Sequence, residues 1–94
     1  MEKDIERRLV QGVTDIGGLA YKFVSPAHRG VADRVVCLPN GSTWFVELKS
    51  PTGKLSPLQV FFRDQMRRLN QNYACLYSRD EVDLWLSERR DELA

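Results

Sequence analysis

The sequence predicts one domain built on a mixed four-stranded β-sheet with helices on its faces. Its length of 94 residues suffices for a single hydrophobic core and is too short for two. The apolar periodicity gives the order helix, three strands, helix, strand, helix. The first three strands can form a meander, whereas the helix between the third and fourth strands makes that pair parallel.

The first helix is expected from about Met1 to Gln11. Ile5, Leu9 and Val13 have the spacing of one helical face. Gly12 is expected to interrupt this pattern, and two further glycines follow a few residues later.

Three strands are expected next, over residues 19–24, 32–38 and 42–50. The last two are joined by Pro39-Asn40-Gly41. Proline suits the first central position of a type I turn, and Gly41 can supply the left-handed residue of a G1 bulge. This predicts a three-residue hairpin loop.

The best-marked helix begins after Ser56, which can serve as its N-cap. Pro57 suits the first helical position, and Gln59 completes a capping box. The expected apolar stripe of this helix consists of Leu58, Phe62, Met66 and Leu69.

A short fourth strand is expected over residues 73–77, and a last helix follows. Ser78 and Glu81 can form a second capping box. The last helix is expected to bury Val82, Trp85 and Leu86.

Composition excludes several classes of protein. The net charge is only +1, so any nucleic-acid contact must depend on a local arrangement of basic residues. No apolar stretch is long enough to cross a membrane, and the charged first residues do not resemble a signal peptide. The two cysteines, Cys37 and Cys75, form no CxxC pair. These features predict a cytoplasmic, reduced protein.

The register of the predicted hairpin places two acids together. If the loop has three residues, Leu38 pairs with Ser42, and counting inward sets Asp33 directly opposite Glu47. Their Cβ atoms would lie about 4.5–5.5 Å apart. Two carboxylates at that distance repel each other, so the arrangement needs a compensating cation.

Oxygen ligands from two carboxylates suit Mg²⁺ or Mn²⁺ better than zinc. Lys49 lies two residues beyond Glu47 on the same face of the strand, where it can hold a phosphate oxygen or orient water. These are the parts for hydrolysis of a phosphodiester. The plainer alternative is a Glu47–Lys49 ion pair on an exposed strand.

The spacing from Asp33 to Glu47-Leu48-Lys49 resembles the PD-(D/E)XK nuclease signature. A longer pattern resembles the VRR-Nuc branch of these nucleases and consists of residues 30–33 (GVAD), 45–51 (FVELKSP), Gly53, Leu55, Ser56 and Gln59. The resemblance extends roughly from Glu6 through the last strand. It implies a restriction-endonuclease-like core and metal-dependent hydrolysis of DNA.

The resemblance also implies roles for individual residues. Asp33, Glu47 and the backbone carbonyl of Leu48 match the metal ligands, and Lys49 matches the catalytic lysine. The matched active-site glutamine is Gln59, which the capping box alone would also explain. Glu6 matches the acid of the first helix that faces the metal, with Glu2 and Asp4 as alternatives. One departure is visible, since Ala32 replaces the proline that usually precedes the aspartate.

Basic residues near the motif are candidate contacts to the DNA backbone, although solvated surface positions would explain them equally well. These are His28, Arg29, Lys54, Arg63 and Arg67. Phe61 and Phe62 are adjacent on one helix and cannot both point to the same core. Surplus apolar surface on so small a domain favours a symmetric dimer, as does the resemblance.

Together these features predict a single nuclease domain over residues 1–94. The expected activity is that of a homodimeric, Mg²⁺- or Mn²⁺-dependent endodeoxyribonuclease, selective for DNA structure such as a four-way junction. No membrane and no small-molecule cofactor are expected to take part. The alternative is a non-catalytic or partner-dependent nucleic-acid-binding module of a replication or repair complex.

Overall fold

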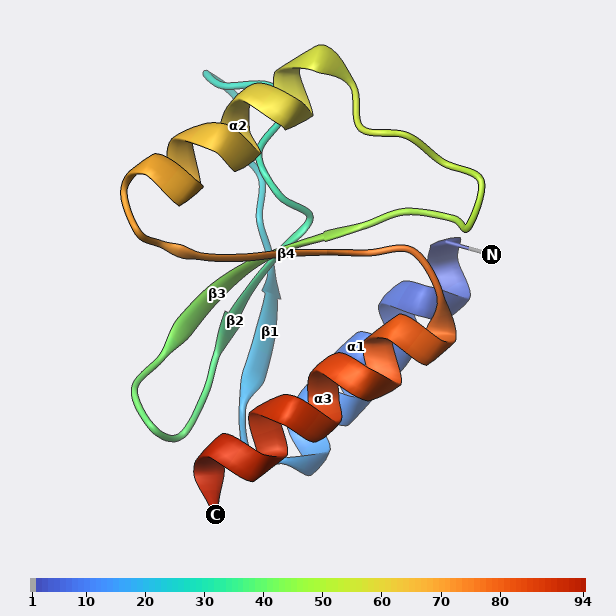
Figure 1. Cartoon of the computed structure of the whole chain (residues 1–94), viewed down its shortest axis with the longest axis vertical. Coiled ribbons are helices and arrows are strands. Elements are labelled where there is room, and N and C mark those ends of the chain that lie inside the picture. Colours follow the sequence, from blue (N-terminus) through green and yellow to red (C-terminus); the bar gives the residue numbers. More distant parts are fainter. Residues whose placement is uncertain (1) are drawn as a thin grey trace.

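The alternation of helical and strand patterns produces the expected order of elements in the computed structural model, which describes residues 2–94. The elements are α1 (Glu2–Asp15), β1 (Leu19–Lys22), β2 (Arg34–Cys37), β3 (Thr43–Leu48), α2 (Pro57–Arg68), β4 (Asn72–Leu76) and α3 (Arg79–Leu93). The strands lie side by side in chain order (Figure 1). The first two pairs are antiparallel and β3–β4 is parallel, so the predicted mixed sheet is confirmed.

The hairpin between β2 and β3 has the predicted three-residue loop. The Leu38 N–H donates to the carbonyl of Ser42 at 2.9 Å, and Gly41 N–H donates back to Leu38 at 3.0 Å. Gly41 has a φ of 85°, the left-handed conformation that favours glycine at a bulge. The resulting register pairs Arg34 with Val46. One step further along the same register, position 33 lies opposite position 47.

One face of the sheet carries the main hydrophobic core. Figure 1 shows α1 and α3 side by side on this face, with α2 on the other side of the sheet. The core combines one stripe from each of these two helices with alternate residues of the central strands. Its buried members are Ile5, Leu9, Val13, Val36, Leu38, Val46, Leu48, Leu76, Val82, Trp85 and Leu86.

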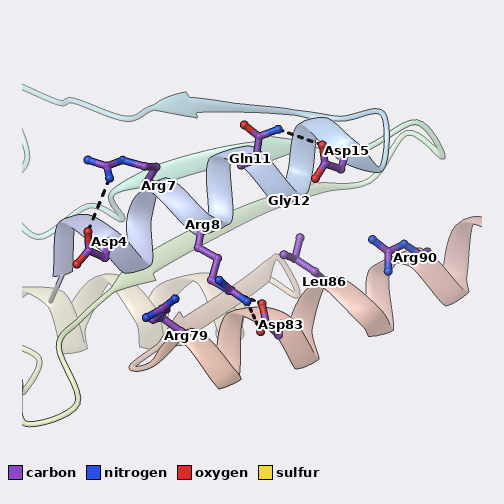
Figure 2. A pocket seen from close by; sticks show the side chains of 10 residues that line it. All are labelled: Asp4, Arg7, Arg8, Gln11, Gly12, Asp15, Arg79, Asp83, Leu86 and Arg90. Atoms are coloured by element: carbon purple, nitrogen blue, oxygen red, sulfur yellow. Dashed lines mark hydrogen bonds and ion pairs between the residues drawn. The ribbon is translucent and has the colours of Figure 1, made fainter.

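The helix α1 does not end at Gly12, as the sequence pattern suggested, but continues to Asp15. Gly12 lies where α1 crosses α3, beside Leu86 (Figure 2). A Cβ atom at position 12 would collide with the Leu86 side chain. The glycine therefore permits close approach of the two helices and does not terminate the first one.

We expect Gly12→Ala to lower the free energy of unfolding by up to about 2 kcal/mol, because overpacking costs about 1–3 kcal/mol and the better helix propensity of alanine returns about 1 kcal/mol. Chemical denaturation measures this change. In a Leu86→Ala background the clash disappears, so the same substitution should become stabilising. An equal effect in both backgrounds would contradict the close-approach explanation.

The helix α2 covers the second face of the sheet through an aromatic cluster. The Phe62 ring lies 5.8–6.4 Å, between centroids, from the rings of Phe23, Phe45 and Tyr73. No residue of α2 is fully buried. The expectation that Leu58 and Leu69 face inward was wrong, since their exposed fractions are 51% and 50%. Only the middle of α2 lies over the aromatic cluster, and both ends of its stripe stay in solvent.

The remaining differences concern element ends. Strands β1, β2 and β3 are shorter than the predicted ranges, and β4 begins one residue earlier, at Asn72. Met1, predicted as the first helical residue, lies outside the described residues. Both cysteines are free. Within residues 2–94 no helix is long and apolar enough to span a membrane.

Candidate active site

The structure brings Asp33 and Glu47 together on the α2 side of the sheet. Glu47 lies in the central strand β3, and its exposed fraction is 2%. Asp33 precedes β2, and its Oδ2 accepts the N–H of Leu48 at 2.8 Å. This bond links the aspartate to β3 where the β2–β3 ladder ends. The Asp33 carboxyl is thereby oriented beside Glu47.

Gln59 and Lys49 complete a cluster around the Glu47 carboxylate. Gln59 Nε2 donates to Glu47 Oε2 at 3.0 Å, and Lys49 Nζ lies 4.0 Å from the same oxygen. The Gln59 side chain also forms the predicted capping box, because its Oε1 accepts the N–H of Ser56 at 2.8 Å. One glutamine thus caps the start of α2 and also contacts the buried acid.

The electrostatics of Glu47 reflect a buried acid next to another acid. Burial, followed by the charge of Asp33 and a hydrogen bond with it, raises the pKa of the Glu47 carboxyl to about 8, although Lys49 acts in the opposite direction. One nearby lysine therefore does not fully compensate the charge at this site. A perturbed acid among convergent polar groups is the usual signature of a functional site.

The donor set fits a hard divalent cation. Asp33 and Glu47 offer carboxylate oxygens, the ligands that Mg²⁺ and Mn²⁺ prefer, and a cation would stabilise the ionised form of Glu47 that burial and Asp33 disfavour. In residues 2–94 no group of three or more His, Cys, Asp or Glu side chains is arranged to hold a metal. A cation here would therefore need backbone and water oxygens as further ligands, and the Leu48 carbonyl is the proposed backbone ligand.

The structure corrects the expectation for Glu6. Its Oε2 accepts a hydrogen bond from Arg34 Nε at 2.8 Å. Arg34 pairs with Val46, whose side chain lies in the core beneath α1 and α3. Glu6 is therefore bound on the opposite face of the sheet from Glu47.

Glu2, at the start of α1, is an exposed acid whose charge adds to the rise in the pKa of Glu47 as the last of its causes, behind burial and Asp33. The sequence contains a signal for this position. Glu2 precedes Ile5 by three residues and Leu9 by seven, so it continues the buried stripe beyond its apolar end.

The candidate DNA contacts fall into two groups. Arg63 and Arg67 lie on α2, where Arg63 Nε pairs with Asp64 at 3.0 Å and Arg67 is exposed in the last turn. Lys54 is exposed in the loop that connects β3 to α2. His28 and Arg29 are exposed in the loop before Asp33 and line an apolar groove beside α2.

That groove has a volume of about 660 Å³, and its aromatic walls are Phe23 in the loop after β1 and Phe61 and Phe62 of α2. Leu58 and Phe61 line it, and their exposed fractions are 51% and 61%. A hollow thus lies directly beside a protruding phenylalanine on one surface.

A cavity of about 710 Å³ lies between α1 and α3 on the other side of the sheet from the acids (Figure 2). Arginine side chains that line the same cavity pair with two of its carboxylates. Arg8 makes two hydrogen bonds to Asp83, at 2.7 and 2.9 Å, and Arg7 lies 3.8 Å from Asp4. This cavity is therefore not the site that Asp33 and Glu47 form.

Comparison with known proteins points in one direction. No protein-family model matches the chain. A curated relative named "Putative nuclease p44", from Acyrthosiphon pisum secondary endosymbiont phage 1, is 48% identical over 79 residues, which cover 84% of this chain and 85% of the relative. A solved structure described as a VRR_NUC domain superposes with a TM-score of 0.87 and 28% identity, over 92% of this chain and 94% of that chain. Both similarities extend over the elements that hold the acid pair.

Proposed function

The chain belongs to the VRR-Nuc family of nucleases and has their restriction-endonuclease-like fold, and from this premise we propose that it is a Mg²⁺- or Mn²⁺-dependent, structure-selective endodeoxyribonuclease. The observation that carries the proposal is the buried Glu47 beside Asp33, with Lys49 and Gln59 on the same carboxylate. The proposed setting is the cytoplasm of a bacterium or a phage-infected cell, in replication or repair of DNA.

Asp33, Glu47 and the Leu48 carbonyl are the proposed ligands of the divalent cation. Glu2 replaces Glu6 as the acid that α1 is proposed to contribute to the site. A divalent cation supplies Lewis-acid activation of the phosphodiester and of the attacking water. The hydrogen bond from the Leu48 N–H holds Asp33 in place. Gln59 does the same for Glu47, because its amide donates to Oε2.

Lys49 is the proposed catalytic lysine. Its ammonium lies beside the acid pair, and its side chain is 18% exposed, so it is anchored and still accessible to a substrate. A fixed positive charge there would stabilise the negative charge that develops on the phosphate oxygens. Arg63, Arg67 and Lys54 are the proposed contacts to the DNA backbone, which position the substrate without reading its sequence. His28 and Arg29 line the groove beside α2 that the proposed homodimer uses, so they are not proposed as DNA contacts.

The test of this function is cleavage of labelled four-way-junction DNA and of a matched linear duplex, each with Mn²⁺ or with EDTA. We expect cleavage of the junction that requires the metal and exceeds cleavage of the duplex. Equal cleavage of both substrates would retain the nuclease and remove the selectivity for branched DNA. DNA binding without cleavage would favour the non-catalytic or partner-dependent module.

The proposed homodimer uses the apolar groove beside α2. The groove offers a hollow, and Phe61 offers a protruding side chain on the same surface. Two copies related by a two-fold axis can each insert the protrusion into the hollow of the other, which is the self-complementarity that an isologous interface requires. Two active sites in one dimer would suit a four-way junction, where two strands are cut.

We expect Phe61→Glu to convert the dimer into a monomer, because a charge at the centre of an apolar interface is strongly unfavourable. Light scattering coupled to size-exclusion chromatography measures the mass. Leu84→Glu is the matched control, since Leu84 is an equally exposed apolar residue (62%) on α3 and should leave the mass unchanged. A dimer that survives Phe61→Glu would place the interface elsewhere.

A further inference from the structure

Tyr77 lies next to Lys49 although it belongs to a different part of the sequence. In the parallel β3–β4 pair, Glu47 is in register with Cys75. The N–H of Lys49 donates to the carbonyl of Leu76 at 3.0 Å, so the ladder continues past the ends of both strands. Lys49 and Tyr77 are therefore neighbours on adjacent strands, about 5 Å apart along the sheet and on the face that carries Glu47.

The structure also holds the Tyr77 backbone in place. The carboxylate of Glu81, which the sequence assigned to the capping box of α3, accepts the N–H of Tyr77 at 3.0 Å. Ser78 is the N-cap of α3, and its hydroxyl accepts the N–H of Glu81. The predicted capping box therefore forms only in part, because Glu81 accepts the N–H of Tyr77 and not that of Ser78. The junction of β4 and α3 thus fixes where the tyrosine enters the site.

The Tyr77 side chain is half-buried at the open edge of the site. β4 is an edge strand, so no further strand lies beyond Tyr77 on that side. The side chain interacts with the Cys75 thiol, which raises the pKa of the Tyr77 hydroxyl, and the charge of Arg63 lowers it. Arg63 acts on Tyr73 in the same sense. Tyr77 therefore borders Lys49 on the side opposite Asp33, and the charge of Arg63, on the helix α2 that packs against β4, reaches the tyrosine.

We propose that Tyr77 binds the DNA strand next to the scissile phosphate, with its hydroxyl donating a hydrogen bond to a backbone phosphate oxygen and Arg63 supplying the positive charge beside it. A phenol adds a neutral donor and an aromatic face, which together suit a phosphate and its sugar. This inference rests on the proposed nuclease function. It adds a substrate contact that the nuclease motif of the sequence does not contain.

The experiment compares Tyr77→Phe with Tyr73→Phe, a matched control on the same strand and the same face. DNA affinity is measured with Ca²⁺ in place of the active metal, and kcat and KM are measured with Mn²⁺. We expect Tyr77→Phe to weaken DNA binding and raise KM by about 10-fold, the usual effect of one hydrogen bond to a charged group, with kcat and Mn²⁺ affinity unchanged. Tyr73→Phe should match the wild type.

The salt dependence of DNA affinity distinguishes the contribution of Tyr77 from that of Arg63. Tyr77→Phe removes no charge, so the slope of log K against log[salt] should stay at the wild-type value. Arg63→Ala should reduce the slope by about one unit, as expected for the loss of a phosphate contact.

Wild-type affinity and KM in Tyr77→Phe would overturn the inference, as would an equal loss in Tyr73→Phe. A wild-type protein that binds DNA without cutting it contradicts the nuclease function instead, and the binding measurements then still test Tyr77.

Discussion

Replacement of Lys49 by alanine is expected to reduce the rate of DNA cleavage by at least about 10²–10³-fold, the usual loss when one fixed group that stabilises developing charge is removed. The ammonium lies 4.0 Å from Glu47 Oε2, inside the acid cluster. Single-turnover cleavage with saturating Mn²⁺ measures the effect. Mn²⁺ affinity should not fall, because the proposed ligands are intact and a competing cation has been removed.

Lys54→Ala is the matched control for Lys49→Ala. It removes an equal charge from the exposed loop after β3. As a contact to the DNA backbone it should alter binding more than the chemical step. If Lys49→Ala cleaves at the wild-type rate while its fold is intact, Lys49 is not the catalytic lysine.

The second large effect concerns the pH dependence of stability in EDTA. The pKa of Glu47 rises from 4.5 in the unfolded chain to about 8 in the folded protein. Between these values the folded state binds more protons than the unfolded state, so the free energy of unfolding falls as the pH rises. The stabilisation is complete below about pH 4.5 and is lost progressively up to pH 8. Its upper bound is about 5 kcal/mol, because each unit of pKa shift corresponds to about 1.36 kcal/mol.

Denaturant unfolding at pH 5.5 and pH 8 tests this expectation. Glu47→Gln should flatten the difference, because a neutral amide keeps the shape of the side chain without titrating. Mn²⁺ should stabilise the wild type more at pH 8 than at pH 5.5, since metal binding competes with the proton. Glu47→Gln should abolish most of that metal effect. A wild type with equal stability at both pH values would show that Glu47 is ionised throughout.

The sequence alone was sufficient for the element order and for the pairing of the two acids. Both depend on local signals. The turn Pro39-Asn40-Gly41 sets the hairpin length, and the period of two along a strand then puts Asp33 opposite Glu47. The capping role of Gln59 was predicted in the same way, because a capping box lies within four consecutive residues, whereas its place beside the acids was implied by the family resemblance.

The tertiary structure decided what depends on contacts between distant elements. Gly12 looked like a helix stop and is instead the crossing point of α1 and α3, because Leu86 lies against it. Glu6 looked like the acid of the first helix, but Arg34 binds it on the other face of the sheet. The sequence pattern does not show which partner a charged side chain will meet across the fold.

The burial of Glu47 and the position of Tyr77 also depend on contacts between elements that are distant in the sequence. Glu47 is buried because α2 and its aromatic cluster cover that face of the sheet, and this burial is the largest cause of its raised pKa. Tyr77 meets Lys49 only through the parallel register of β3 and β4, which a helical crossover leaves unspecified in the sequence. Turn chemistry and strand period therefore determined the pairing of Asp33 with Glu47, whereas packing between helices and strands determined the electrostatics and the neighbours of this pair.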